Sequence, residues 1–424
     1  MHILWVKVGG LWPLNTGGRL RSFHILKELA RRHRVTVLTT HGPGDDPDGL
    51  AAQIPEAHVV SVPHASAKQG SARFALALAR SWLSPRPVEL LRWSVPELRR
   101  TTEGQLAQGA ADVCVADFLT SIPNVPFGGA VPVVLFEHNV EHVIWKRLHD
   151  TERGALRRLL LALEWRKVRR SESRACAEAA LTLSVSDVDE RSLRALAGGA
   201  RVETIPTGVD AQFFRPLPVP EVRGHLVFSG SMDWYPNEDG ILNFLERAWP
   251  EIRQHVPDAT LTVAGRNPRP RLRRAAAAAG GVKLTGTVDD IRPFVARGAL
   301  YVAPLRVGGG TRLKLFEALA MGKAIVATRV AAEGLPIVPG EHYVAADRPA
   351  DFAAAVVALL ADRRRRDALG AAGRRLVEER FSWPCVTDVV EGHLARVVRE
   401  SALRKAGAAG RLACPTPGRL QEQR

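Results

Sequence analysis

The chain has 424 residues, of which 46% are hydrophobic, and 59 lysines and arginines against 44 aspartates and glutamates give it a net charge of +15. This composition excludes a globally disordered chain. The length exceeds the roughly 250 to 300 residues at which one core stops growing, which favours two domains. The charge favours anionic partners, and by itself it does not separate nucleotides, nucleic acid and acidic lipid headgroups.

The chain begins with Met1–Val8, which reads as a strand because no basic leader precedes a long apolar run. No stretch approaches the roughly 20 apolar residues of a membrane-spanning helix. The four cysteines are far apart and form no CxxC pair, so neither a zinc site nor a disulfide framework is predicted. These features indicate a cytoplasmic protein.

Short β-rich runs alternate with helical patterns through the first half of the chain, and the pattern over residues 20–32 places Phe23, Leu26 and Leu29 on one helix face. Such alternation predicts parallel strands with helical crossovers on both sides of a sheet. Strands are predicted at His2–Val8, Arg34–Thr39, His58–Val62, Asp112–Ala116, Val131–Phe136, Leu181–Val185 and Val202–Ile205.

Prolines cluster between Phe213 and Pro220, and the alternation then restarts with strands predicted near residues 226, 260, 282, 300 and 324. We therefore predict an α/β protein with two doubly wound parallel sheets that face a central cleft, an arrangement that suits a reaction between two substrates. The predicted parts are a first domain over residues 1–214, a linker over 215–222, a second domain over 223–380, a C-terminal helix over 381–405 packing towards the first domain, and a disordered tail over 406–424.

The strongest local signal is the segment Pro304–Lys323, in which a strand ends, glycines turn the chain and a helix follows. Thr311 can cap this helix and Gly322 can close it. Arg312 and Lys314 lie in its first turn, where the helix dipole disfavours cations by about 0.3 to 1 kcal/mol each. A diphosphate bound by the loop amides, the helix end and the two cations would explain them. The structural alternative is a pair between Lys314 and Glu317.

Glu317 follows Thr311 by six residues, which is about 9 Å along a helix axis. This separation is close to that between a diphosphate and the ribose hydroxyls of one nucleotide. A carboxylate is a natural acceptor for those hydroxyls.

The chain resembles glycosyltransferase family 4, of the glycosyl transferases group 1 type and the GT-B fold, and the resemblance covers nearly the whole sequence. It is carried by six motifs in the family's order, namely Gly17-Gly18, Glu137-His138-Asn139, Ser184-Val185-Ser186, Ile205–Asp210, Val263-Ala264-Gly265 and Glu317–Gly322. It is closest to the subgroup with a Gly-Gly-Gly-Thr-Arg-x-Lys loop, which is often linked to exported polysaccharides.

The resemblance implies a retaining transfer of sugar from a nucleotide-diphosphate sugar to a glycan or lipid-linked acceptor, in cell-surface polysaccharide synthesis. It implies that the domain over residues 1–214 holds the acceptor and that the domain over 223–380 binds the nucleotide sugar. It also implies that Glu317 binds the donor ribose, that His138 lies beside the transferred sugar, and that Gly17 and Gly18 approach donor phosphate or acceptor. The structural alternatives are a satisfied histidine at position 138 and an ordinary turn at the two glycines.

The chain departs from the family pattern in two places. Gly309 stands where many members have a glutamate, eight positions before Glu317, and the loop Gly230–Asn237 lacks the usual arginine and lysine. We expect Arg312 and Lys314 to replace those cations, with Arg266 as a third candidate. The backbone of Gly309, Gly310 and Thr311 would then contact the sugar.

No convincing carboxylate pair for a double displacement is evident, so we predict front-face substitution in which the departing diphosphate takes the acceptor proton. Asp187 and Asp189 form an Asp-x-Asp sequence, but they open a predicted helix, where Asp is a favoured cap. No cofactor and no essential metal are expected.

Two other functions remain open. A nucleotide-sugar epimerase of the same two-domain plan would bind the donor without an acceptor, and a basic nucleic-acid-binding protein would explain the charge, although no binding module with interleaved basic and aromatic residues is evident. Residues Lys146–Arg174 carry ten lysines and arginines against four acidic residues. With Trp12, Trp145 and Trp165 they suggest peripheral attachment to an anionic membrane surface.

Overall fold

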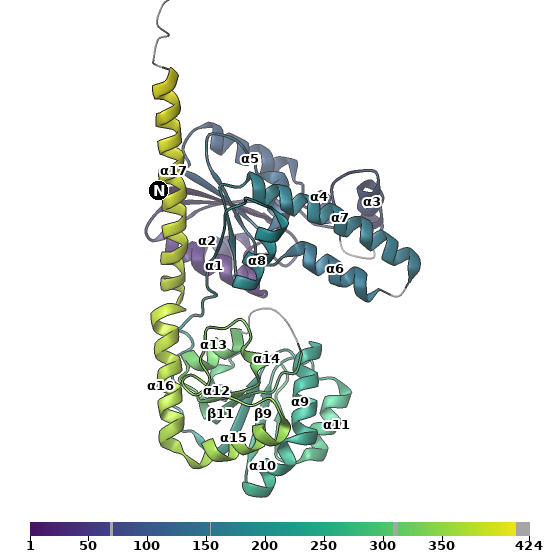
Figure 1. Ribbon diagram of the computed structural model, residues 1–424, viewed down its shortest axis with the longest axis vertical. Coiled ribbons are helices and arrows are strands. Elements are labelled where there is room, and N and C mark those ends of the chain that lie inside the picture. Colours follow the sequence, from purple (N-terminus) through teal and green to yellow (C-terminus); the bar gives the residue numbers. More distant parts are fainter. Residues whose placement is uncertain (68–70, 153, 308–312, 413–424) are drawn as a thin grey trace, which may run out of the picture. The chain divides into compact units, whose positions relative to one another are not determined.

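The computed structural model of the protein describes residues 1–67, 71–152, 154–307 and 313–412 (Figure 1). The chain forms two compact units: unit 1 contains Met1–Pro206 and the residues from Thr387 onward, and unit 2 contains Thr207–Val386. Each unit is built on its own parallel sheet. The predicted α/β class with two doubly wound sheets is therefore confirmed.

Unit 1 has a seven-stranded sheet in the order β3-β2-β1-β4-β5-β6-β7. The order reverses between β1 and β4, and ligands of doubly wound sheets bind at the carboxyl ends of strands at such a reversal. Every residue of β1 and β4 is buried, as expected for central strands covered on both faces. The strands are β1 (His2–Lys7), β2 (Arg34–His41), β3 (His58–Pro63), β4 (Val113–Asp117), β5 (Val133–Phe136), β6 (Leu181–Ser184) and β7 (Val202–Thr204).

The helices of unit 1 include a group that extends from the sheet, formed by α3, α4, α6 and α7 (Figure 1). The helices are α1 (Gly17–Ala30), α2 (Pro47–Gln53), α3 (Ala72–Trp82), α4 (Val88–Arg92), α5 (Pro96–Ala107), the 3-10 helix η1 (Leu119–Asn124), α6 (Glu141–Thr151), α7 (Ala155–Glu178) and α8 (Asp187–Leu196). No helix in the described part of the chain is both long and apolar enough to cross a membrane.

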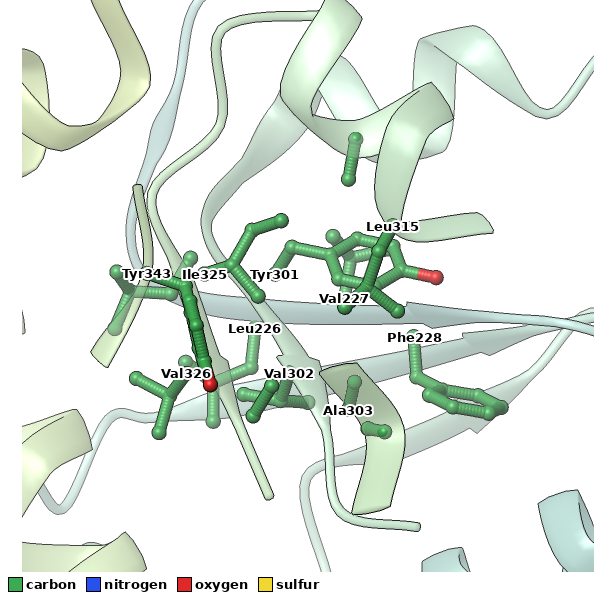
Figure 2. Close-up of a cluster of buried hydrophobic side chains, with 14 of the residues drawn as sticks. Leu226, Val227, Phe228, Tyr301, Val302, Ala303, Leu315, Ile325, Val326 and Tyr343 are labelled. Carbon is green, nitrogen blue, oxygen red and sulfur yellow. The ribbon is translucent and has the colours of Figure 1, made fainter. Parts of the chain in front are cut away.

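Unit 2 has a six-stranded sheet in the order β10-β9-β8-β11-β12-β13, which reverses between β8 and β11. Its core is formed by the central strands, and Figure 2 shows Val227 of β8, Tyr301 of β11 and Ile325 of β12 on one side of the sheet. The strands are β8 (Val222–Ser229), β9 (Thr260–Ala264), β10 (Val282–Leu284), β11 (Gly298–Ala303), β12 (Ile325–Ala327) and β13 (Val344–Ala345).

The helical segment between β8 and β9 is two helices in the structure, Tyr235–Arg247 and Trp249–His255. The chain breaks at Ala248 because Pro250, in the first turn of the second helix, has no N–H and its ring clashes with the preceding turn. The helices of unit 2 are α9 (Tyr235–Arg247), α10 (Trp249–His255), α11 (Pro270–Ala279), α12 (Arg292–Arg297), α13 (Leu313–Ala320), α14 (Arg329–Ala332), α15 (Pro349–Ala361) and α16 (Arg363–Arg380).

The last helix, α17 (Trp383–Leu412), continues beyond residue 406, where the sequence predicts a tail, and residues 413–424 lie outside the described part of the chain. Ion pairs hold its later turns to the rest of unit 1. Arg32 pairs with Asp388 and, at 2.9 Å, with Glu391, while Arg201 and Glu400 lie 2.6 Å apart.

Candidate functional site

A buried cluster of charged side chains lies where the strand order of unit 1 reverses. Lys7 ends β1 and Asp117 ends β4, and the Lys7 Nζ lies 3.4 Å from Asp117 Oδ2. Trp5 Nε1 donates to the same carboxylate at 2.9 Å, and His138, just after β5, contacts its other oxygen. The carboxyl ends of three neighbouring strands thus meet around one carboxylate.

His138 has partners at both ring nitrogens. Its Nε2 lies 2.7 Å from Asp117 Oδ1 and its Nδ1 lies 3.2 Å from Arg21 Nη1. Because a carboxylate only accepts and a guanidinium only donates, Nε2 carries the proton and Nδ1 accepts. Phe118 stacks on the ring with centroids 3.9 Å apart, and Phe136 lies at 4.1 Å. This arrangement agrees with the structural alternative for position 138, a histidine whose ring nitrogens both form hydrogen bonds within the protein.

Burial sets the protonation of this cluster. It lowers the pKa of the His138 imidazole to about 4, of the Arg21 guanidinium to about 10, and of the Lys7 ammonium below its usual value. Burial alone would raise the pKa of the Asp117 carboxyl, but Lys7 and His138 hold it below its usual range. At neutral pH the cluster therefore holds a neutral imidazole and an ionised Asp117.

Phe118 adopts a backbone conformation that few residues other than glycine use, with φ 73° and ψ 151°, at a cost of about 1 to 3 kcal/mol. This turn places its ring under the Lys7 ammonium, 3.9 Å from the centroid, and beside the first turn of α1. A Cβ at Gly18 would lie 2.4 Å from Phe118 Cζ, whereas one at Gly17 would meet nothing within 4 Å. Gly18 thus permits close packing, and Gly17 faces open space.

In unit 2, Lys314 reaches from α13 to the loop that follows β8. Its Nζ donates to Asn237 Oδ1 at 2.5 Å and lies 4.5 Å from the centroid of the Phe228 ring. A Cβ at Gly230 would lie 2.7 Å from this Nζ. Lys314 therefore places its ammonium beside the loop Gly230–Asn237, in which the family resemblance leads one to expect cations and the sequence has none.

Asn237 fixes this contact because both the oxygen and the nitrogen of its side-chain amide form hydrogen bonds. It is buried, and its Nδ2 donates to the carbonyl of Ser231 at 2.8 Å. The ends of β8 and β9 meet here with no side chain between them, since a Cβ at Gly265 would lie 1.8 Å from the Gly230 carbonyl oxygen. Gly265 is thus required for close approach of the two strand ends.

Arg266 and Glu317 belong to the same edge of unit 2. Arg266 Nε donates to Ser231 Oγ at 2.6 Å, while 62% of its side chain is exposed. Glu317 is one turn of α13 beyond Lys314, and burial raises the pKa of its carboxyl to about 7 against the charge of Lys314. The predicted Gly309, Gly310, Thr311 and Arg312 lie outside the described residues.

Gly322 and the Asp-x-Asp sequence both serve to end or begin a helix. Gly322 has φ 68° and the Lys323 N–H donates to the Ala318 carbonyl, as in a glycine-closed helix end. Asp187 and Asp189 lie in the first turn of α8, but the cap is Ser186, whose side chain accepts from the Asp189 N–H. The expectation that an aspartate caps this helix is therefore corrected, because Ser186 occupies the N-cap position and both aspartates lie within the helix.

The sequence analysis did not single out Lys7, Arg21, Asp117, Phe118 or Asn237, which the structure places in the two candidate clusters. Lys7 and Asp117 had a signal, since each is a charged residue that directly follows an apolar run of a predicted strand. Phe118 and Asn237 had none, because their importance depends on a backbone angle and on a contact across 77 residues.

Two family models match the chain. Residues 17–213 match the model described as Glycosyltransferase Family 4, and residues 223–362 match Glycosyl transferases group 1. A curated relative from Mycobacterium tuberculosis, a GDP-mannose-dependent alpha-(1-6)-phosphatidylinositol monomannoside mannosyltransferase, is 28% identical over 251 residues. That match spans 52% of this chain and 61% of the relative's length.

Solved structures share the fold over most of the chain. Sucrose-phosphate synthase from Thermosynechococcus elongatus has a TM-score of 0.64 at 16% identity, covering 94% of this chain and 99% of that one. HepE from Anabaena, in complex with UDP and glucose, has a TM-score of 0.59 at 15% identity over 93% and 99%. WaaG, a glycosyltransferase involved in lipopolysaccharide biosynthesis, has 0.58 at 18% over 92% and 100%. The fold is therefore GT-B.

Proposed function

We propose that this chain, which carries a glycosyltransferase family 4 domain followed by a glycosyl transferases group 1 domain, transfers a sugar from a nucleotide-diphosphate sugar to an acceptor. The observation that carries the proposal is the Lys314 ammonium, held by Asn237 beside Gly230 at the carboxyl end of β8. A cation fixed at the strand-order reversal of a doubly wound sheet is suited to bind a diphosphate.

The donor would lie along α13. Its diphosphate would meet Lys314 and Arg266, and its ribose hydroxyls would meet the Glu317 carboxylate, one helical turn from Lys314. HepE, which shares the fold, was solved with UDP and with UDP-glucose, and this supports a nucleotide-sugar donor. The base and the sugar are left to experiment.

The reaction would retain the configuration of the transferred sugar. Negative charge grows on the departing diphosphate as the sugar becomes oxocarbenium-like, and fixed cations that oppose this charge lower the barrier. Lys314 and, by the sequence argument, Arg312 would supply that stabilisation without an essential metal. The leaving oxygen would take the acceptor proton. His138 would support the site by holding the ends of β4 and β5 together, since both of its ring nitrogens have partners.

The acceptor would be a glycan or a lipid-linked glycan on the inner face of the cell membrane, in the synthesis of cell-surface polysaccharide. The name of the mycobacterial relative places its own acceptor on a phosphatidylinositol mannoside, and WaaG acts in lipopolysaccharide synthesis. Both support a lipid-linked acceptor for this chain.

A panel of UDP, GDP, ADP and TDP sugars tests the proposal by thermal shift, since a ligand that binds only the folded protein raises its melting temperature. We expect one nucleotide class to stabilise the protein and its sugar to be transferred to a lipid extract, with the anomeric configuration read by NMR. Isomerisation of the donor without any acceptor would instead identify an epimerase. No shift with any of the four classes would overturn the proposal.

A further inference from the structure

Large exposed apolar side chains of unit 1 gather on the extension formed by α3, α6 and α7. Figure 1 shows these helices extending from the sheet of unit 1. We call this set the leucine patch, and it comprises Leu76, Trp82 and Leu83 at α3, Ile144 and Leu148 on α6, and Leu156, Leu159 and Leu163 on α7. Soluble proteins seldom expose such a group unless it has a binding function.

The exposed face of α7 changes from apolar to basic along the helix. Leu156, Leu159 and Leu163 recur at helical spacing, and Arg166 and Arg170 continue the same exposed stripe towards the sheet. Leu156 is 70% exposed and Leu159 57% exposed. The stripe spans about 21 Å, with apolar side chains at one end and cations at the other.

The opposite face of α7 fixes the extension through two buried glutamates. Glu164 accepts from Ser81 Oγ at 2.6 Å and from the Val88 N–H at 2.7 Å, so it holds the segment between α3 and α4. Glu172 accepts from the N–H groups of Glu141 and His142 at the start of α6, at 2.7 and 3.0 Å. Because these carboxylates are fully satisfied and buried, the leucines are presented on a built surface.

The positive charge around the leucine patch favours an anionic partner. Residues Lys146–Arg174 carry ten lysines and arginines against four acidic residues. A second copy of the chain would bring two positive faces together, which is unfavourable. A bilayer with acidic headgroups accepts both components, since leucines insert at the acyl boundary and arginines meet phosphates.

We propose that the leucine patch docks the protein on the surface of an anionic phospholipid bilayer. The contact differs from the one suggested by the tryptophans, because Trp12 packs on Phe23 with centroids 5.4 Å apart and Trp165 lies over His149 at 6.1 Å. A depression of about 280 Å³ beside the patch, lined by Leu76, Ala77, Arg80 and Leu91, gives room for part of an acyl chain. The inference deepens the proposed function by naming the surface at which a lipid-linked acceptor is met.

Sedimentation with vesicles tests this surface with the full chain and no donor. Vesicles of equal parts phosphatidylcholine and phosphatidylglycerol are compared with vesicles of phosphatidylcholine alone. We expect the double variant Leu156→Ser and Leu159→Ser to bind the acidic vesicles about tenfold or more weakly. The matched control, Val188→Ser with Leu403→Ser, changes exposed apolar residues elsewhere in unit 1 and should bind like the wild type.

A second pair of variants tests the charge. Arg166→Glu with Arg170→Glu should abolish the preference for acidic vesicles, whereas Arg364→Glu with Arg375→Glu, which makes the same charge change on exposed positions of α16, should preserve it. Equal loss in both pairs would reduce the effect to net charge and overturn the proposal. The proposal would also be overturned if the leucine variant bound the acidic vesicles as tightly as the wild type does.

Two further measurements separate the other outcomes. Circular dichroism and the thermal shift by nucleoside diphosphate show that the leucine variant is folded and that its donor site is intact. If the wild type ignores vesicles but dimerises through the leucine patch in analytical ultracentrifugation, a second copy is the occupant and the membrane proposal is wrong. Because vesicle binding needs no donor, this test and the nucleotide-sugar panel can fail independently.

Discussion

The two units place charged residues at the same topological position, the carboxyl ends of strands at a reversal of strand order, and use them differently. In unit 1 the Lys7 ammonium and the Asp117 carboxylate are buried against each other and against His138. In unit 2 the Arg266 guanidinium is 62% exposed and lies 3.7 Å from the Asp233 carboxylate, and the Lys314 ammonium donates to the amide oxygen of Asn237. The buried pair of unit 1 supports the fold, whereas the cations of unit 2 lie nearer to solvent, where an anionic ligand can also meet them.

The comparison is tested most strongly at Asp117. Replacing it with alanine leaves the buried Lys7 ammonium without its counter-charge, and we expect the free energy of unfolding to fall by about 3 to 5 kcal/mol. Urea unfolding followed by circular dichroism measures the change. Asp150→Ala, at a carboxylate that is 45% exposed, is the control and should leave the stability close to that of the wild type. A similar small effect at both positions would mean that the cluster of unit 1 does not stabilise the fold.

Lys314 should show the opposite behaviour. Lys314→Ala removes the cation proposed to bind the diphosphate, and we expect affinity for the preferred nucleoside diphosphate to fall about 10-fold to 100-fold, as for other hydrogen bonds to charged groups. Isothermal titration calorimetry measures the affinity. Lys283→Ala, on the exposed side of β10, keeps the same change of net charge and should bind like the wild type. Unchanged binding by Lys314→Ala would remove Lys314 from the site.

The carboxyl of Glu317 should make nucleotide binding in unit 2 depend on pH. Its half-buried carboxyl has a pKa of about 7 because it is partly removed from water, so it is mostly neutral below that pH and mostly ionised above it. Since the ionised form accepts hydrogen bonds from ribose hydroxyls more strongly, nucleotide affinity should rise by up to about tenfold between about pH 6 and pH 8. Glu317→Gln keeps the titration of the diphosphate but lacks this rise. The same pH profile in both proteins would contradict a role for the carboxylate.

The same pKa predicts a cost in stability. A carboxyl whose pKa is raised in the folded state from 4.5 to about 7 destabilises the fold progressively as the pH rises between those values. Glu317→Gln should therefore melt higher than the wild type above about pH 7 and equally below about pH 4.5. A melting temperature unaffected by the substitution at high pH would mean that the carboxyl is better solvated than its position indicates.

The sequence predicted the two sheets because most strands are short apolar runs, and β6 and β7 were placed within one residue of their bounds. It placed Lys314 and Glu317, three positions apart, on the helix that follows the glycine loop. It did not predict that His138 has partners at both nitrogens, since Arg21 and Asp117 are 117 and 21 residues away in sequence. It also stressed the basic residues and tryptophans of the extension, whereas the exposed leucines became evident only when burial was known.

Asn237 decides whether the charge of Lys314 is available to a ligand. An amide oxygen can hold the ammonium at 2.5 Å without cancelling its charge, whereas a carboxylate of the same shape would neutralise it and repel a diphosphate. Asn237→Asp should therefore weaken nucleoside diphosphate binding about threefold to tenfold, with a melting temperature close to that of the wild type. Arg266→Ala, which removes a cation that is 62% exposed, should change affinity less than about threefold. If Asn237→Asp bound as tightly as the wild type, Lys314 would act only as a structural residue, and unit 2 would resemble unit 1 after all.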